Sequence, residues 1–182
     1  MLADFDRLLA SARTGEPHAC RLIFDDLARP VAGYLRARGA RDVEDLTSDV
    51  FLAVFTGLDR FVGGQPEFRS WVFTIAHRRM VDDHRRRVRT PWLEEYEPGS
   101  DDRVSPSAED GALERLGTLE VERLLALLTD EQREVLTLRV VGDLTVEQVA
   151  AIMGKQPGAI KALQRRGLEA IRRAMAVEGA GR

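Results

Sequence analysis

The chain has very little cysteine and no long apolar run. Its 182 residues include one cysteine, Cys20, which excludes an internal disulfide framework and suits a reducing cytoplasm. No apolar stretch approaches the roughly 20 residues that a membrane span requires. Residues 1–6 (MLADFD) lack the basic start of a secretory signal. We therefore expect a cytoplasmic protein without membrane insertion.

The net charge of −3 is distributed unevenly. Residues 1–90 carry +2, residues 91–117 carry −6 and residues 118–182 carry +1. The stretch 90–117 also holds three of the seven prolines and shows no helical or strand period, which predicts a flexible acidic linker between two domains. Because phosphate neutralisation supplies most non-specific affinity, the balanced charge of each end predicts weak binding of the free protein to DNA.

Apolar residues recur at helical spacing on both sides of this linker, with no strand-like alternation and no internal repeat. The sequence predicts an all-α fold of two small helical domains, residues 1–89 and 118–182, joined by the linker. Helices are expected at about residues 4–12, 17–38 (bent or interrupted near Pro30), 42–57, 67–87, 119–128, 130–141, 146–153 and 157–175.

Residues 119–175 predict a helix-turn-helix. Thr145 and Gln148 have the spacing of a capping box, and Gly154 suits a left-handed turn after the helix that they begin. The second helix has an apolar stripe and, facing away from it, a basic surface comprising Lys161, Ala162, Arg165, Arg166, Arg172 and Arg173. A basic helix face is more often plain solvated surface, but the cap, the turn and the helix together favour a recognition helix for a DNA major groove.

The helix expected over residues 42–57 has an acidic face with an apolar element. Its apolar positions follow helical spacing, and the opposite face carries Glu44, Asp45, Ser48, Asp49 and Leu52. Such a face can dock a basic partner helix, or it can be ordinary solvated surface.

The helix expected over residues 67–87 interleaves aromatic residues with arginines and follows a Gly-Gly loop. Aromatic rings beside guanidinium groups suit unstacked bases of single-stranded DNA. For Phe68 and Trp71 alone, packing in a core is the simpler interpretation. The run of arginines at 85–87 is also explained by the helix dipole, which favours positive charge at a C-terminus.

Two segments resemble conserved regions of bacterial RNA polymerase sigma factors. DVEDLTSDVFLAVF followed by FRSWVFTIAHRRMVDDHRRR resembles the second region, and LTDEQREVLTLRVVGDLTVEQVAAIMGKQPGAIKALQRRGLEAIRR resembles the fourth. With no intervening third domain, the chain is similar to the extracytoplasmic-function (ECF) group of the sigma-70 family. The resemblance implies a transcription initiation factor that binds core RNA polymerase and promoter DNA, is controlled by an anti-sigma factor, and has neither catalytic residues nor a cofactor.

The resemblance also assigns roles to residues. It implies polymerase docking by Glu44, Asp45, Asp49 and Leu52. It implies recognition and melting of the minus-ten element by Arg60, Phe61, Gln65, Arg69, Trp71, Thr74, His77, Arg78 and Arg79. It implies minus-thirty-five recognition by Lys161, Ala162, Arg165 and Arg166. Departures from the family pattern include Arg78, where Asn is common, and Ala162, which cannot donate a hydrogen bond to a base.

Two other functions are weighed. A polymerase-independent repressor or activator would explain the helix-turn-helix but leave the acidic helix and the aromatic-arginine helix without a role. A metal-dependent hydrolase would have to use Asp82, Asp83 and His84, with His77. Adjacent aspartates diverge by about 100° on a helix, and no second cluster of metal ligands exists in the sequence.

Overall fold

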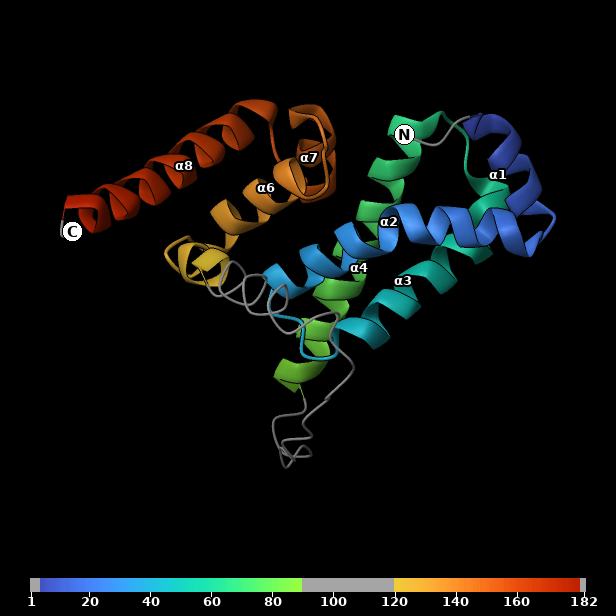
Figure 1. The fold of residues 1–182 in the computed structure, drawn as a ribbon, viewed down its shortest axis with the longest axis horizontal. Helices are drawn as coiled ribbons and strands as arrows, with labels where there is room; N and C mark the ends of the chain where they lie inside the picture. The colour runs from blue at the N-terminus through green and yellow to red at the C-terminus, as the bar shows by residue number, and fades with distance from the viewer. Residues whose placement is uncertain (1–3, 90–119, 181–182) are drawn as a thin grey trace.

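The structure, a computed structural model, describes residues 4–89 and 120–180, and these are entirely helical apart from turns and short loops. The all-α prediction is confirmed (Figure 1). The predicted linker, residues 90–117, lies outside the described residues. The helices are α1 (Phe5–Arg13), α2 (Pro17–Ala37), α3 (Val43–Gly57), the 3-10 helix η1 (Leu58–Arg60), α4 (Gln65–Arg89), a short helix at residues 120–126, α6 (Asp130–Val140), α7 (Val146–Met153) and α8 (Pro157–Ala180).

Helices α1 to α4 make up the N-terminal half, residues 4–89, in which α2, α3 and α4 pack against one another. Their facing side chains, among them Ile23, Val31, Val50 and Val72, are completely buried. Removing one such aliphatic side chain from water contributes about 1.5–3 kcal/mol. The apolar stripe expected on α3 is therefore the face that forms this core.

Pro30 does not interrupt α2, which is one helix from Pro17 to Ala37. A proline in a helix interior removes a backbone hydrogen bond. The residues around it, Leu27, Val31 and Tyr34, are buried against the other helices. Burial of this face offsets the lost bond, so α2 continues through Pro30 and the interruption, one of the two expected outcomes, does not occur.

Helices α6, α7 and α8 make up most of the C-terminal half, residues 120–180. The predicted capping box at Thr145 and Gln148 is present, and a second one at Thr129 and Gln132 begins α6. Gly154 ends α7 in the left-handed conformation with φ of 63°, as the sequence predicts. These local features fix where α6 and α7 begin and where the chain turns into α8.

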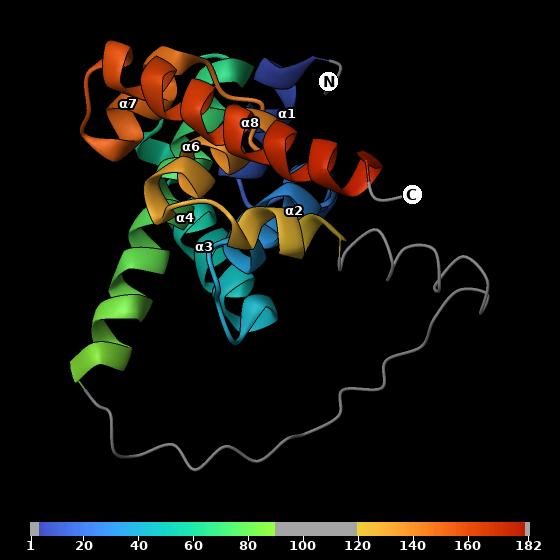
Figure 2. The ribbon, with the colours of Figure 1, turned by 90° about the vertical axis from the view of Figure 1, so that its left-hand side faces the viewer.

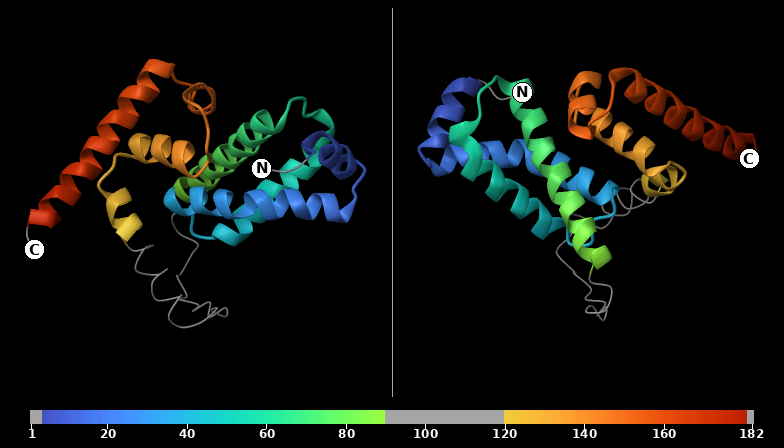
Figure 3. Two further views of the ribbon diagram at one scale, coloured as in Figure 1. Left: turned by 45° about the horizontal axis from the view of Figure 1, so that its top comes forward. Right: turned by 180° about the vertical axis from the view of Figure 1, so that it is seen from behind.

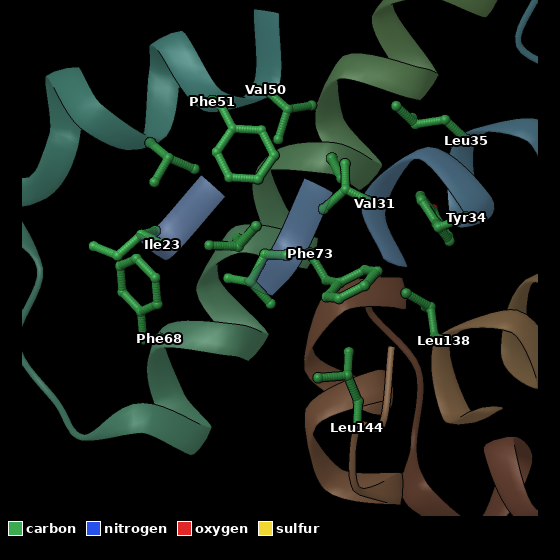
Figure 4. Close-up of a cluster of buried hydrophobic side chains, with 14 of the residues drawn as sticks. Ile23, Val31, Tyr34, Leu35, Val50, Phe51, Phe68, Phe73, Leu138 and Leu144 are labelled. Carbon is green, nitrogen blue, oxygen red and sulfur yellow. The ribbon is translucent and has the colours of Figure 1, made fainter. Parts of the chain in front are cut away.

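The two halves are packed together. Helix α2 lies against α6, and α4 lies against α7, and Figure 3 shows the same arrangement from two further sides. Buried apolar residues form one cluster through both halves, and Figure 4 shows Leu138 and Leu144 beside the part of it that holds Tyr34 and Phe73. The C-terminal end of α4 projects away from the other helices (Figure 2).

Candidate nucleic-acid and polymerase interfaces

The basic face of α8 is open to solvent. Lys161, Arg165 and Arg166 are exposed and Ala162 is half-buried, whereas Ile160 and Leu163 between them are buried. Arg165 Nη1 lies 3.4 Å from the Glu169 carboxylate one turn further along, which holds the guanidinium along the outer face of the helix. The four residues assigned to minus-thirty-five recognition therefore share one accessible surface.

Gly167 lets α8 lie very close to α6. A β-carbon at this position would be 2.9 Å from Leu136 Cδ1 and 3.4 Å from Gln132 Cβ. Because real β-carbons do not approach that closely, a larger residue would displace the Leu136 side chain or push α8 away from α6. The close approach sets the direction in which α8 presents its basic face.

The acidic face of α3 is also exposed. Glu44, Asp45 and Asp49 are exposed, and Leu52, about one turn beyond Asp49 along the helix, is 68% exposed. An exposed leucine beside carboxylates matches the chemistry expected of a protein-docking surface. The structure thus brings all four predicted polymerase-binding residues together on one helix.

The segment after η1 forms a pocket of about 590 Å³ against the start of α4. Its walls include Phe61, Trp71 and Thr74. The Phe61 ring is buried, with its centroid 5.2 Å from both Phe68 and Trp71. Phe68 is buried in the core, as predicted from the sequence. Trp71 is half-buried and lines the pocket. A partly accessible indole ring beside polar side chains suits contact with an unstacked base.

Arg13, on α1, holds this segment in place. Its Nε donates a hydrogen bond to the carbonyl oxygen of Leu58 at 3.2 Å, and its Nη2 donates another to the carbonyl oxygen of Phe61. Sequence reasoning missed Arg13 because its two acceptors are backbone atoms 45 and 48 residues further along the chain.

The residues on α4 assigned to the minus-ten element occupy different faces. At about 100° per residue, Trp71, Thr74 and Arg78 share one face. Arg69 and His77 share another, which is turned toward the C-terminal half, and Arg79 lies on a third. Arg78 is exposed, and Trp71 and Thr74 line the pocket.

Arg69 and His77 contact the C-terminal half directly. Arg69 Nε donates a hydrogen bond to the Gly142 carbonyl oxygen at 2.6 Å, and its Nη2 donates to the Val141 carbonyl oxygen at 3.4 Å. Nearby, Gln148 Nε2 donates to the Pro66 carbonyl oxygen at 3.1 Å, and Gln148 also lines the pocket beside Trp71.

Glu134 of α6 is the centre of a buried polar cluster, the Glu134 cluster, which comprises Tyr34, Arg38, His77 and Glu134. Its Oε1 accepts hydrogen bonds from His77 Nδ1 at 2.6 Å and from the Tyr34 hydroxyl at 3.1 Å. Its Oε2 lies 3.4 Å from Arg38 Nη2. The Glu134 side chain is 8% exposed, and a carboxylate so deeply buried is stable only when paired and hydrogen-bonded.

The electrostatics of the Glu134 cluster follow from this geometry. Burial alone would raise the pKa of Glu134, but the hydrogen bond from His77 and the positive charge of Arg38 outweigh it and hold the pKa below its usual range. Burial, and next the negative charge of Glu134, raise the pKa of the Tyr34 hydroxyl. Glu134 is therefore ionised and Tyr34 neutral at pH 7.

Other sequence hypotheses find less support in the described residues. Asp82 pairs with Arg85 at 3.9 Å and Asp83 with Arg87 at 2.8 Å, so the two carboxylates are engaged by different arginines. Within residues 4–89 and 120–180, no group of three His, Cys, Asp or Glu side chains is placed to hold a metal ion. Over the same residues, none of the helices has the length and apolar character of a membrane span.

Comparison with known proteins adds an independent observation. The family model for sigma-70 region 2 matches residues 23–90, and the model for sigma-70 region 4 matches residues 118–171. The ECF RNA polymerase sigma factor BldN of Streptomyces coelicolor is 33% identical over 91% of this chain, which spans 64% of the length of BldN.

A second relative aligns over more of its own length. The ECF RNA polymerase sigma factor SigD of Mycobacterium tuberculosis is 31% identical over 92% of this chain and 82% of SigD. Among solved structures, the sigma factor RpoE in complex with the anti-sigma factor NepR from Bartonella quintana has a similar fold. The TM-score is 0.63, with 20% identity over 86% of this chain and 96% of that one.

Proposed function

The chain belongs to the ECF group of the sigma-70 family, and we propose that it binds core RNA polymerase and directs transcription initiation at promoters with defined minus-ten and minus-thirty-five elements. One observation carries the proposal: the two regions that match sigma-70 family models contain three separate surfaces whose chemistry suits binding to polymerase or DNA. These surfaces are the acidic face of α3, the aromatic pocket beside α4 and the basic face of α8.

Docking to polymerase is assigned to α3. Its exposed Leu52 supplies apolar contact, and Glu44, Asp45 and Asp49 supply charge for a basic partner surface. Charges at the edge of such a contact chiefly raise the association rate and exclude wrong partners, while the apolar centre supplies affinity.

Reading of the minus-ten element is assigned to the pocket lined by Phe61 and Trp71 and to the face of α4 that carries Thr74 and Arg78. Flipping a base out of a duplex costs a few kcal/mol. Stacking on aromatic side chains returns about 1–3 kcal/mol per base. Melting is therefore confined to sites whose unstacked bases fit the pocket.

Reading of the minus-thirty-five element is assigned to α8, entering a major groove with Lys161, Ala162 and Arg165 toward base edges and Arg166 toward phosphate. A bidentate arginine contact to a guanine contributes about 1–3 kcal/mol of discrimination. The methyl group of Ala162 can contact only an apolar group such as the thymine methyl.

We also propose that an anti-sigma factor controls the protein. Support comes from the RpoE structure, a similar fold that was solved bound to an anti-sigma factor. The phosphodiester chemistry belongs to the polymerase, so the chain itself needs no catalytic residue or cofactor.

The test is run-off transcription with bacterial core polymerase on fragmented genomic DNA, with and without the protein. New starts at a discrete set of sites are expected. The absence of new starts, together with sequence-specific binding by the protein alone, would contradict the proposal and identify a polymerase-independent regulator instead.

A further inference from the structure

We propose that Glu134 is the latch of an autoinhibited form: its carboxylate, seated between Tyr34, Arg38 and His77, holds the two halves of the chain together so that Arg69 and His77 are withheld from promoter DNA. The arrangement seen in the structure is termed the closed form. The inference rests on the proposed function, because it concerns when the minus-ten surface becomes available.

The first support is the identity of the residues that the contact occupies. Arg69 and His77 are both assigned to minus-ten recognition, yet their polar atoms bind Gly142, Val141 and Glu134 of the C-terminal half. A guanidinium or imidazole N–H that donates to protein oxygen cannot at the same time donate to DNA. Closure therefore occupies Arg69 Nε and His77 Nδ1, two donors that recognition of the minus-ten element would otherwise have available.

The second support is the position of Gln148. Its side-chain amide donates to the Pro66 carbonyl oxygen, and Gln148 forms part of the wall of the pocket beside Trp71. The C-terminal half thus reaches the rim of the pocket as well as the neighbouring face of α4. The same closure affects both parts of the minus-ten surface.

The third support is the chemistry of the Glu134 cluster. In the closed form its carboxylate is paired on both oxygens, and after separation of the halves water would solvate it. A buried ion pair that loses one of its partners leaves an uncompensated charge, which strongly destabilises the structure around it. The closed form is therefore sensitive to any change in the cluster, and a partner that binds only the open form can shift the equilibrium.

The population of the closed form can be measured with an engineered disulfide. A β-carbon at Gly33 would lie 3.4 Å from Val141 Cγ1 across the contact between α2 and α6. Because Val141 Cγ1 is one bond from Val141 Cβ, the two β-carbons lie no more than about 5 Å apart, close to the separation of roughly 3.5–4.5 Å that a disulfide needs. The test protein carries Gly33→Cys, Val141→Cys and Cys20→Ser in the full chain.

The first measurement is the equilibrium constant for the intramolecular disulfide in a glutathione buffer at pH 7. We expect Glu134→Ala to lower it at least tenfold, because the halves separate more often. Glu131→Ala is the matched control: it removes a carboxylate from the same helix, but Glu131 pairs with Lys155 inside the C-terminal half at 2.8 Å. Arg38→Ala, on the other side of the contact, should lower the equilibrium constant as much as Glu134→Ala does. An equilibrium constant unchanged by both Glu134→Ala and Arg38→Ala would overturn the latch.

The second measurement is run-off transcription by the double-cysteine protein, oxidised and reduced. We expect the oxidised protein to be inactive and thiol reduction to restore initiation. Equal activity of the oxidised and reduced forms would overturn the withholding of Arg69 and His77. Failure of the reduced protein and of the unmodified chain alike would instead refute the sigma function, whereas the disulfide equilibrium still reports on the latch.

Discussion

Arg13 Nε donates a hydrogen bond to the carbonyl oxygen of Leu58 over 3.2 Å, which ties the end of α1 to the start of η1. The same guanidinium also reaches the Phe61 carbonyl oxygen, so one side chain fixes both ends of a segment that forms part of the wall of the pocket beside Trp71. Arg13, which lies 45 residues or more before this segment in the sequence, thereby positions the residues assigned to base capture.

Arg13→Ala should lower promoter melting. The loss of hydrogen bonds from a charged donor costs about 1.5–3 kcal/mol, and we expect part of this to appear as roughly a three- to tenfold drop in open complexes, measured by permanganate reactivity of unpaired thymines. Arg7→Ala on the same helix, where the side chain is exposed and pairs with nearby Asp4, is the control. Equal melting by the two variants would argue against a positioning role.

Arg165→Ala should change promoter choice. The side chain is exposed on the basic face of α8, so its removal leaves the fold intact. A lost bidentate base contact of about 1–3 kcal/mol corresponds to a roughly 5- to 150-fold loss at promoters with one particular upstream base. Sequencing of transcripts from genomic fragments measures this. Arg173→Ala, nearer the phosphates, should weaken all promoters alike. An unaltered promoter profile for Arg165→Ala would mean that the groove assignment is wrong.

Asp49→Arg should weaken binding to core polymerase at every promoter. The substitution reverses a charge on the exposed acidic face of α3 without entering the core. We expect at least a tenfold higher dissociation constant, measured by fluorescence anisotropy with labelled protein. Asp25→Arg on the exposed surface of α2 is the matched charge reversal. A similar effect of both variants would point to overall charge instead of a specific docking surface.

Gly167→Val should destabilise the C-terminal half. The new β-carbon meets Leu136 Cδ1 at 2.9 Å, and such overpacking costs about 1–3 kcal/mol. Urea unfolding followed by circular dichroism measures the free energy. Gly158→Ala, where a β-carbon meets nothing within 4 Å, should be neutral or stabilising. Equal stability of Gly167→Val and the unmodified chain would show that α8 is free to move away from α6.

Acid should open the closed form. The pKa of Glu134 is depressed in the closed form, so its ionisation stabilises closure above the ordinary carboxyl pKa of about 4.5, and this contribution is lost as the pH falls through the depressed value. Fluorescence energy transfer between dyes on the two halves should therefore show a difference between the unmodified chain and Glu134→Gln at pH 6 to 7. The difference should shrink below about pH 4.5. If the two proteins still differed by the same amount in acid, the ionised Glu134 carboxylate would not be what stabilises the closed form.

Local features were predictable from the sequence and contacts between the halves were not. Thr145 and Gln148 identify a helix start because both partners lie within four residues, and Gly154 identifies the turn for the same reason. The exposed basic face of α8 followed from periodicity alone. Each of these depends only on backbone geometry near the residue.

The Glu134 cluster depends on residues far apart in the sequence. Glu134 and Tyr34 are 100 residues apart, and no periodicity links them. One signal was present: Glu134 precedes the buried run Val135 to Leu138, where a carboxylate needs a partner. Likewise, the residues assigned to the minus-ten element were treated as one surface, although helix geometry alone places Arg69 and Trp71 on different faces of α4.

Closure has a consequence for how the protein responds to a signal. Glu134 touches other residues of the same chain, so the closed form withdraws the same fraction of molecules from every promoter. The apparent affinity for each promoter falls by that fraction, while the ratio between any two promoters stays the same. Substitutions in the Glu134 cluster should therefore alter the strength of the transcriptional response and leave the choice of genes to Lys161 and Arg165.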